Sequence, residues 1–255
     1  MNNSVKKTGT LFLIPNTLGE ENREAQITSV LPNEVIVQSA KLKYWVVENA
    51  KTARSLLKAI GTINPLVCPI QEMHMSEWRG SKTNTDPKEL IKPLLEGHDM
   101  GLMSEAGLPA VADPGAEIVA AAHQANIQVV PLTGPSSLML ALMASGMNGQ
   151  RFLFNGYLPI KNPERTLTIK SLEAESRKFK QTQLWIETPY RNGGMLESVT
   201  SCLSDGTQLC VAIDLSLPTQ QVLSMSISKW RNWIKANATT VASLDKRPAV
   251  FLMLA

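Results

Sequence analysis

Long apolar runs are missing from this 255-residue chain. A transmembrane helix needs about 20 consecutive apolar residues, and the sequence contains no such segment. Near the N-terminus the apolar run is only LFLIP, which is shorter than the hydrophobic core of a signal peptide. The sequence therefore predicts a cytoplasmic protein without a membrane partner.

Cysteine and histidine are both scarce, with three residues of each. The cysteines, Cys68, Cys202 and Cys210, contain no CxxC pair, and their odd number indicates reduced, buried thiols rather than a disulfide framework. The histidines stand apart, without other ligand-type residues at metal-binding spacing. We expect no metal site.

Two phosphate-binding signatures are absent as well. The chain has neither the GxxxxGK[ST] loop of ATPases nor the GxGxxG loop of dinucleotide-binding proteins. Their absence argues against an ATPase and, more weakly, against a dinucleotide-dependent enzyme. Aromatic residues make up only 5% of the chain, so few rings are available to stack on bases.

The chain does contain enough apolar residues for a large core, since 44% are hydrophobic and 18% charged. In the first half, short apolar runs alternate with longer mixed segments. We predict strands at 10–14, 43–48, 100–104 and 127–132, and helices at 49–61, 86–97, 113–126 and 135–146. Pro93 is expected to bend or shorten its helix. This alternation predicts a parallel sheet with crossover helices.

A second block of strands and helices follows. It is predicted to contain a strand from residue 151, a charged helix over 163–180, a strand and loop over 183–191, a helix to about 203, and strands at 208–216 and 248–255. We therefore predict an α/β protein of two lobes with a ligand cleft between them. The N-terminal lobe (1–149) has a parallel sheet and the C-terminal lobe (150–255) a mixed sheet.

The net charge of +3 is unevenly distributed. Residues 1–150 carry twelve basic and fourteen acidic side chains, whereas residues 151–255 carry thirteen and eight, a net charge of +5. This asymmetry fits a polyanionic partner such as RNA. It fits equally a solvated helix face with interleaved glutamates, so both interpretations stay open.

Three loops of small residues follow predicted strands of the first lobe: PNTLGE, SEAGLPAVADPG and LTGPSS. Ligands of parallel sheets bind beyond the carboxyl ends of the strands, and residues without long side chains let a ligand approach the backbone. Without Lys or Arg, these loops are poorly suited to a triphosphate. They fit a nucleoside-like ligand such as S-adenosylmethionine, or they are tight turns that cap packed helices.

Five motifs occur in a fixed order: SEAGLPAVADPG, PLTGPSS, ALMASG, FLFNGYLPIK and ETPYR. In this order and spacing they resemble the tetrapyrrole-methylase superfamily, and most closely its branch of 16S rRNA cytidine ribose 2′-O-methyltransferases. The resemblance runs from about Thr10 to the C-terminus. It implies a tetrapyrrole-methylase-like fold, a homodimer, S-adenosylmethionine as methyl donor in the cleft, and RNA or a ribosomal subunit as substrate.

The resemblance also implies which residues bind the donor. Matched motif by motif, they are Pro15, Ser104, Glu105, Ala106, Val111, Gly134, Pro135, Ser136, Glu187 and Ala212.

A ribose hydroxyl is a weak nucleophile, so a base or a cation beside it would assist methyl transfer. Glu105, Glu187 and Arg191 are the catalytic candidates, with Lys161 as a further one. Each glutamate fits equally a helix cap or a structural ion pair, Arg191 fits a phosphate contact, and Lys161 fits ordinary surface exposure. Asp113 is expected to be the N-cap of the helix that it precedes.

The chain departs from the rRNA branch at four places. IPNTLGE stands where that branch reads Thr-Pro-Ile-Gly-Asn, and ENAKTARSLL where it reads Glu-Asp-Thr-Arg. Glu105 replaces an aspartate, and ETPYR has Thr188 and Tyr190 for serine and histidine. The motifs implied for donor binding thus match the rRNA branch better than the first-lobe segments expected to face the acceptor. This difference is expected of a sibling subfamily that methylates another acceptor.

Three functions are therefore weighed. The leading hypothesis is an S-adenosylmethionine-dependent methyltransferase of rRNA. The second is a methyltransferase of a tetrapyrrole or another small molecule. The third is a non-catalytic module that binds S-adenosylmethionine or RNA, which the altered ENAKTARSLL segment suggests.

Overall fold

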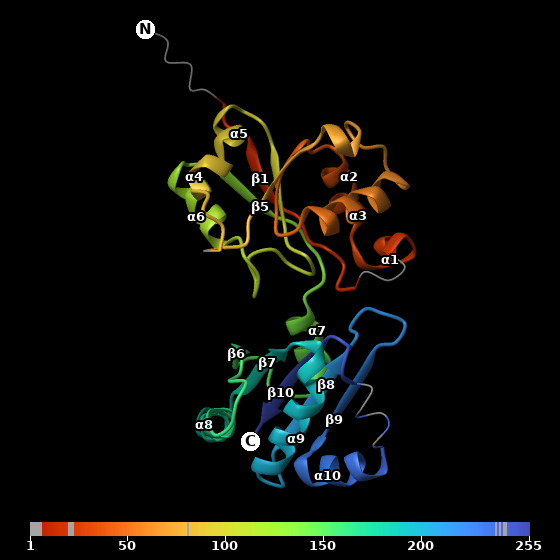
Figure 1. The fold of residues 1–255 in the computed structure, drawn as a ribbon, viewed down its shortest axis with the longest axis vertical. Coiled ribbons are helices and arrows are strands. Elements are labelled where there is room, and N and C mark those ends of the chain that lie inside the picture. Colours follow the sequence, from red (N-terminus) through yellow and green to blue (C-terminus); the bar gives the residue numbers. More distant parts are fainter. Residues whose placement is uncertain (1–6, 20–22, 81, 238, 240, 242–243) are drawn as a thin grey trace. The chain divides into compact units, whose positions relative to one another are not determined.

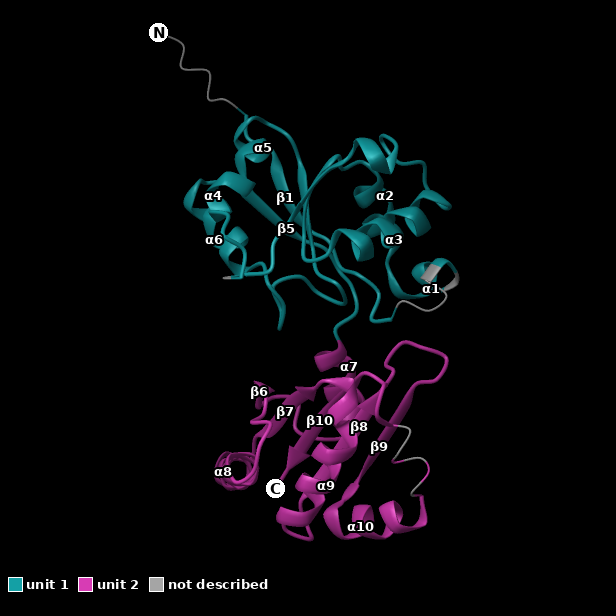
Figure 2. Ribbon diagram, in the orientation of Figure 1, with its two compact units in different colours: residues 1–136 teal, residues 137–255 magenta. Residues whose placement is uncertain are grey.

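The computed structural model describes residues 7–19, 23–80, 82–237, 239, 241 and 244–255. The chain divides into two compact units, which we call unit 1 (Met1–Ser136) and unit 2 (Ser137–Ala255) (Figure 2). Each unit has its own five-stranded sheet. The predicted α/β class is confirmed. None of the described helices is long and apolar enough to cross a membrane.

The sheet of unit 1 is parallel throughout, with the strand order β3-β2-β4-β1-β5. Its strands are β1 (Thr10–Leu13), β2 (Tyr44–Val47), β3 (His74–Glu77), β4 (Met100–Met103) and β5 (Gln128–Pro131). Because all strands run in one direction, every loop that follows a strand starts at the same edge of the sheet. β1, β4 and β5 are direct neighbours there.

Helices cover both faces of this sheet (Figure 1). One face carries α1 (Arg23–Val30), α2 (Asn33–Ala40) and α3 (Ala50–Gly61), and the other carries α4 (Pro87–Leu90), α5 (Lys92–Leu95) and α6 (Ala116–Gln124). A short 3-10 helix, η1 (Ile70–Glu72), precedes β3. The sequence did not predict α1, α2 or β3. The helix predicted over 86–97 is two short helices, and the second contains Pro93 near its start, as a residue without an N–H requires.

The sheet of unit 2 is mixed, with the order β6-β7-β10-β8-β9. Its strands are β6 (Phe152–Tyr157), β7 (Thr182–Glu187), β8 (Gln208–Ile213), β9 (Gln221–Ser226) and β10 (Ala249–Leu254). β6 and β7 are parallel, and the other pairs are antiparallel. β6 and β9 are therefore edge strands.

One face of this second sheet is covered by α8 (Glu164–Phe179), α9 (Asn192–Cys202) and α10 (Ile227–Ala236), and η2 (Pro189–Arg191) links β7 to α9. α7 (Ser137–Ser145) packs against β8, β9 and β10. The Ser224 hydroxyl donates a hydrogen bond to the Ser145 carbonyl (2.7 Å). α7 is thus part of unit 2, and the compact units divide before it rather than after residue 149, where the sequence placed the junction. An apolar helix belongs to the unit whose sheet buries it, and the local sequence pattern does not indicate which of the two sheets that is.

Candidate functional site

The three small-residue loops of unit 1 meet at the carboxyl ends of β1, β4 and β5. The backbone N–H of Asn16, in the first loop, donates a hydrogen bond to the Gly107 carbonyl of the second (2.8 Å). A Cβ atom on Gly134, in the third loop, would collide with Pro15. Only glycine at position 134 therefore permits this close approach between the first and third loops. The first loop was expected to end at Glu20, which lies outside the described residues.

This loop cluster contains every first-lobe residue that the sequence predicted for donor binding. Pro15 and Ser104 are buried and Glu105 and Val111 exposed, while the others are half-buried, namely Ala106, Gly134, Pro135 and Ser136. The structure therefore brings residues more than a hundred positions apart in the chain to one edge of the sheet. Residue types with small side chains leave backbone groups of this edge accessible to a ligand.

The second loop has an unusual backbone. Gly107 and Gly115 have positive φ angles of 65° and 140°, and Ala110 and Ala112 each have a φ of 64°. An L-residue other than glycine in the left-handed region costs roughly 1–2 kcal/mol, so the surrounding contacts hold the loop in this shape. Such over-determined backbone is common at ligand sites.

Asp113 is not the N-cap that the sequence predicted. α6 begins at Ala116, its N-cap is Gly115, and no side chain caps it. The positive φ of Gly115 turns the chain away, and the Asp113 carboxyl instead forms a hydrogen bond with Ser104. Burial and the nearby Glu48 and Glu105 carboxylates raise the pKa of Asp113 to about 6, against the opposing effect of the Ser104 hydrogen bond.

Glu48 and Glu105 lie beside Asp113 at the ends of β2 and β4. The Glu105 N–H donates a hydrogen bond to Glu48 Oε2 (3.0 Å), and the Thr52 hydroxyl donates one to Glu105 Oε1 (3.4 Å). These acidic groups give this edge a negative potential. Across the described residues, no group of three or more His, Cys, Asp and Glu side chains is arranged to hold a metal ion.

Glu187 and Arg191 form an ion pair in unit 2. Glu187 ends β7 with its side chain buried, and its Oε1 lies 2.7 Å from Arg191 Nη2 and accepts the Thr188 N–H at 2.7 Å. Arg191 Nε also donates to the Thr188 hydroxyl (2.8 Å). These contacts hold η2 against the end of β7. Glu187 Oε2 is buried without a hydrogen-bond partner among the described residues, an acceptor that fits an external N–H or O–H donor.

Ala212 lies near the same end of the sheet as Glu187 but on its other face. Ile213 and Glu187 both pair with Ala249 of β10, so Ala212 is one residue back from that row. Because side chains alternate along a strand, Glu187 shares the face of Trp185, whereas Ala212 faces the side covered by α7. The structure therefore does not bring the side chains of Ala212 and Glu187 together.

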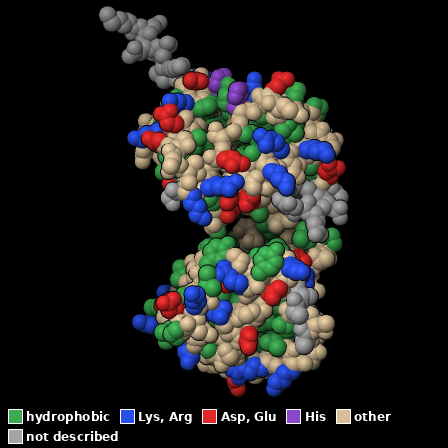
Figure 3. Space-filling view, in the orientation of Figure 1, with side chains coloured by type: hydrophobic (Ala, Val, Ile, Leu, Met, Phe, Trp, Pro, Cys, Tyr) green, Lys and Arg blue, Asp and Glu red, His purple; other side chains and the backbone are tan. Residues whose placement is uncertain are grey.

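Two exposed tyrosines lie at the end of the sheet where Glu187 and Arg191 are found. Tyr157, which pairs with Ile186 in register, is 59% exposed, and Tyr190, in η2, is 76% exposed. Lys161 is exposed in the segment that follows β6. Lys and Arg side chains are interspersed with hydrophobic ones on the face of unit 2 that Figure 3 shows. This combination of rings and cations is typical of nucleic-acid contacts.

The three cysteines are free thiols. Only Cys210 is buried, whereas the sequence predicted burial for all three and the structure leaves Cys68 and Cys202 half-buried. Burial raises the pKa of Cys210 to about 11 and also raises the pKa of Cys202. Neither of these two thiols is activated as a nucleophile.

The sequence analysis missed two residues that shape the loop cluster, Asn16 and Glu48. Glu48 comes directly after β2 and Asn16 three residues after the end of β1, and both side chains contact the loop after β4. The available signal was a polar residue at the carboxyl end of an apolar run. That signal alone does not say which loop the side chain reaches.

Comparison with known proteins gives related sequences and one related fold. The chain is 38% identical over 129 residues to the ribosomal RNA small subunit methyltransferase I of Synechocystis sp., a match that covers 51% of this chain and 45% of that protein. The protein of the same name from Escherichia coli O157:H7 is 32% identical over 57% of this chain and 50% of its own length. The chain thus spans about half the length of these relatives.

A third relative of that name, from Pseudomonas aeruginosa, is 26% identical over 90% of this chain and 74% of its own length. No family model matches the chain. Among solved structures, the uroporphyrin-III C-methyltransferase of Thermus thermophilus superposes with a TM-score of 0.53 at 14% identity, covering 96% of this chain and 94% of that one. At this identity the likeness concerns the fold alone.

The two-unit α/β fold of the chain is thus similar to that of a uroporphyrin-III C-methyltransferase. In sequence, the chain is similar to ribosomal RNA small subunit methyltransferases I of several bacteria.

Proposed function

We propose that the chain is an S-adenosylmethionine-dependent methyltransferase of small-subunit ribosomal RNA, acting on the ribose 2′-oxygen of a cytidine. The observation that carries this proposal is the similarity to rRNA methyltransferases, which in one relative extends over 90% of the chain. The loop cluster supports it, because small residues at the carboxyl ends of parallel strands suit a nucleoside-like donor.

In this proposal the donor is bound by the loop cluster. The residues involved are Pro15, Ser104, Glu105, Ala106, Val111, Gly134, Pro135 and Ser136. The implied roles of Ala212 and Glu187 in donor binding stay predictions. S-adenosylmethionine supplies an electrophilic methyl carbon on a sulfonium. The negative potential of Glu48, Glu105 and Asp113 suits this cationic donor. The cleft expected between the lobes stays a prediction.

Glu105 is our proposed proton acceptor for the hydroxyl that receives the methyl group. Its side chain is exposed at the loop cluster, where the Thr52 hydroxyl donates a long hydrogen bond of 3.4 Å to it. Glu187 is less suited, because its carboxylate is buried and neutralised by Arg191. We therefore assign Glu187 and Arg191 to the shape of η2, which presents Tyr190.

Two surfaces fit an RNA acceptor. In unit 1, α3 starts within the ENAKTARSLL segment and exposes Lys51, Arg54 and Lys58 along one side of the helix. In unit 2, Tyr157 and Tyr190 expose rings near Arg191. Cations that contact phosphates supply most non-specific affinity for RNA, and exposed rings stack on single-stranded bases.

We also propose that the protein acts as a homodimer in the cytoplasm. The dimer is supported by β6, an edge strand whose Phe152 and Leu153 are 38% and 43% exposed. Edge strands with exposed apolar residues favour pairing with a second chain.

Donor binding can be tested by thermal unfolding. S-adenosylmethionine at a hundred times its dissociation constant stabilises the native state by about 2.7 kcal/mol and raises the melting temperature accordingly. An unchanged melting temperature in millimolar donor would argue against the methyltransferase proposal.

The acceptor can be tested with labelled donor. Small ribosomal subunits from a strain that lacks the gene should accept the methyl group, whereas subunits from the parent strain should not. Transfer to a small-molecule extract instead would identify the tetrapyrrole-type alternative. RNA binding that weakens steeply with salt, without any transfer, would identify the non-catalytic alternative.

A further inference from the structure

Asn16 is a fully buried amide in the loop after β1, with 0% of its surface exposed. Its Nδ2 donates hydrogen bonds to the backbone carbonyls of Ser104 (3.1 Å) and Glu105 (2.9 Å) in the loop after β4. Its Oδ1 accepts the Thr17 N–H (2.8 Å). The amide therefore ties two loops that are 88 residues apart in the sequence.

Glu48 holds the same peptide from its other side. Glu48 Oε2 accepts the N–H of Glu105 at 3.0 Å, and the N–H of Glu48 donates to the Met103 carbonyl at 3.0 Å. The N–H of Glu105 is thus bound by a side chain from the end of β2, and its carbonyl by a side chain from the end of β1. The backbone of Glu105 is therefore held from both of the strands that flank β4.

We propose that Asn16 and Glu48 are positioning residues, which fix the backbone of residues 104–106 in its donor-binding shape before the donor arrives. This inference rests on the proposed function of the loop cluster. Asn16 is too deeply buried to touch a ligand, so its effect passes through the loop. A loop that is ordered in advance loses less conformational entropy on binding. The contacts are needed because Ala110 and Ala112 adopt the unfavourable left-handed conformation in the observed loop.

The first arm of the test compares Asn16→Leu with a control of matched stability. Leucine keeps the branched shape of asparagine and removes both donated hydrogen bonds. Ile36→Ala is the control, since Ile36 lies in the core of the same unit on α2. Titration calorimetry of the full chain with S-adenosylmethionine should show an affinity about tenfold weaker for Asn16→Leu. Ile36→Ala should bind within about twofold of wild type.

The second arm uses conservative replacements that separate positioning from general stability. Glu48→Gln and Glu48→Ala both remove the charge, but only Glu48→Gln retains an oxygen that accepts the Glu105 N–H. Glu48→Gln should therefore bind the donor several-fold more tightly than Glu48→Ala. Asn16→Asp places a carboxylate against two carbonyl oxygens. Its affinity relative to wild type should recover as the pH falls, because a protonated carboxyl can donate one of the lost hydrogen bonds.

A third measurement does not depend on the donor. Amide hydrogen exchange in the peptide that contains residues 104–107 should accelerate in Asn16→Leu and Glu48→Ala but not in Ile36→Ala. Wild-type donor affinity in both loop variants would overturn the positioning role and leave the proposed function standing. Absence of donor binding in the wild-type titration would overturn both, and that result is visible without any variant.

Discussion

At the scale of single residues, Asp113 carries the largest electrostatic consequence in the loop cluster. Its carboxyl is half-buried beside Glu48 and Glu105, and its pKa is raised from 3.8 to about 6. The native state therefore holds this proton more tightly than the unfolded chain does. The resulting contribution to the free energy of unfolding is fully present below about pH 4 and is lost as the pH rises to about 6.

Replacing Asp113 with asparagine should remove this dependence on pH. We expect the free energy of unfolding at neutral pH to rise by about 1 kcal/mol, a value reduced from the full linkage term because solvent still reaches a half-buried group. Urea denaturation of wild type and Asp113→Asn at several pH values between 4 and 7 measures the difference. Parallel curves for the two proteins would contradict the prediction.

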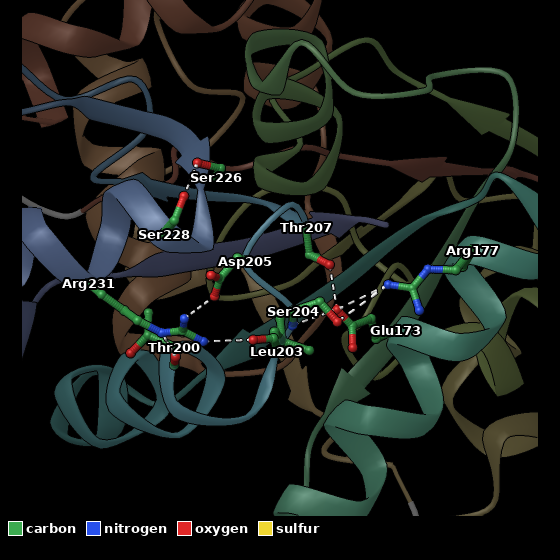
Figure 4. Close-up of polar contacts among 10 residues, drawn as sticks. All are labelled: Glu173, Arg177, Thr200, Leu203, Ser204, Asp205, Thr207, Ser226, Ser228 and Arg231. Atoms are coloured by element: carbon green, nitrogen blue, oxygen red, sulfur yellow. Dashed lines mark hydrogen bonds and ion pairs between the residues drawn. The ribbon is translucent and has the colours of Figure 1, made fainter.

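At the scale of elements, a polar network joins α8, the segment between α9 and β8, and α10 (Figure 4). Glu173 on α8 accepts hydrogen bonds from the Ser204 N–H (2.9 Å) and the Thr207 hydroxyl, and it pairs with Arg177. Arg231 on α10 donates to the carbonyls of Thr200 and Leu203 (2.8 Å each) and pairs with Asp205. The network therefore ties α8 and α10 to the segment that leads from α9 to β8.

Glu173→Ala should destabilise the protein because it leaves the Ser204 N–H and Thr207 hydroxyl without a partner. We expect a loss of about 2 kcal/mol at neutral pH in urea denaturation. Burial alone raises the pKa of Glu173, but the hydrogen bonds from Thr207 and Ser204 outweigh burial and lower it. The wild-type advantage should therefore persist above the ordinary pKa and fade as the pH falls through the lowered one.

Glu175→Ala provides the matched control for that measurement, since Glu175 is exposed on the same helix. It should change the free energy of unfolding by no more than about 0.5 kcal/mol. Equal losses in the two variants would mean that the network contributes nothing specific.

The exposed side of α3 supplies a prediction about RNA. Arg54→Ala should weaken binding of a single-stranded oligoribonucleotide uniformly across sequences and reduce the salt slope by about 1. Lys92→Ala is the control, because Lys92 lies on α5 and pairs with Glu89. Fluorescence anisotropy across a salt series measures both slopes. An unchanged slope in Arg54→Ala would place the RNA contacts elsewhere.

At the scale of the whole molecule, the two units differ in charge and in their free edges. Unit 2 carries the whole basic excess, because unit 1 has more acidic than basic residues, and unit 2 also has β6 as an exposed apolar edge. Leu153→Lys should shift the assembly towards the monomer in sedimentation velocity, because a charged side chain opposes edge pairing. Leu167→Lys, on the exposed side of α8, should leave it unchanged. A monomeric wild-type protein would contradict the proposed dimer.

The sequence alone was informative where a local pattern is sufficient. Short apolar runs identified β1, β2, β4 and β5, and the Gly, Ala and Pro content of three loops identified the edge of the sheet where they meet. It missed β3, whose four residues are mostly exposed and polar in pattern. It also missed α1 and α2, because the segment from 23 to 40 has no turn signal that separates two short helices other than Pro32.

The sequence by itself determined the α/β class, the three small-residue loops and the order of the motifs, because strand runs, small residues and motif order are properties of neighbouring positions. Only the tertiary structure decided that Asn16 and Glu48 hold Glu105, that Asp113 faces Ser104 instead of capping α6, and that α7 packs in unit 2. It likewise placed Ala212 and Glu187 on opposite faces of one sheet, since strand register sets the face. Contacts between segments far apart in the chain depend on the path of the backbone, which no local pattern contains.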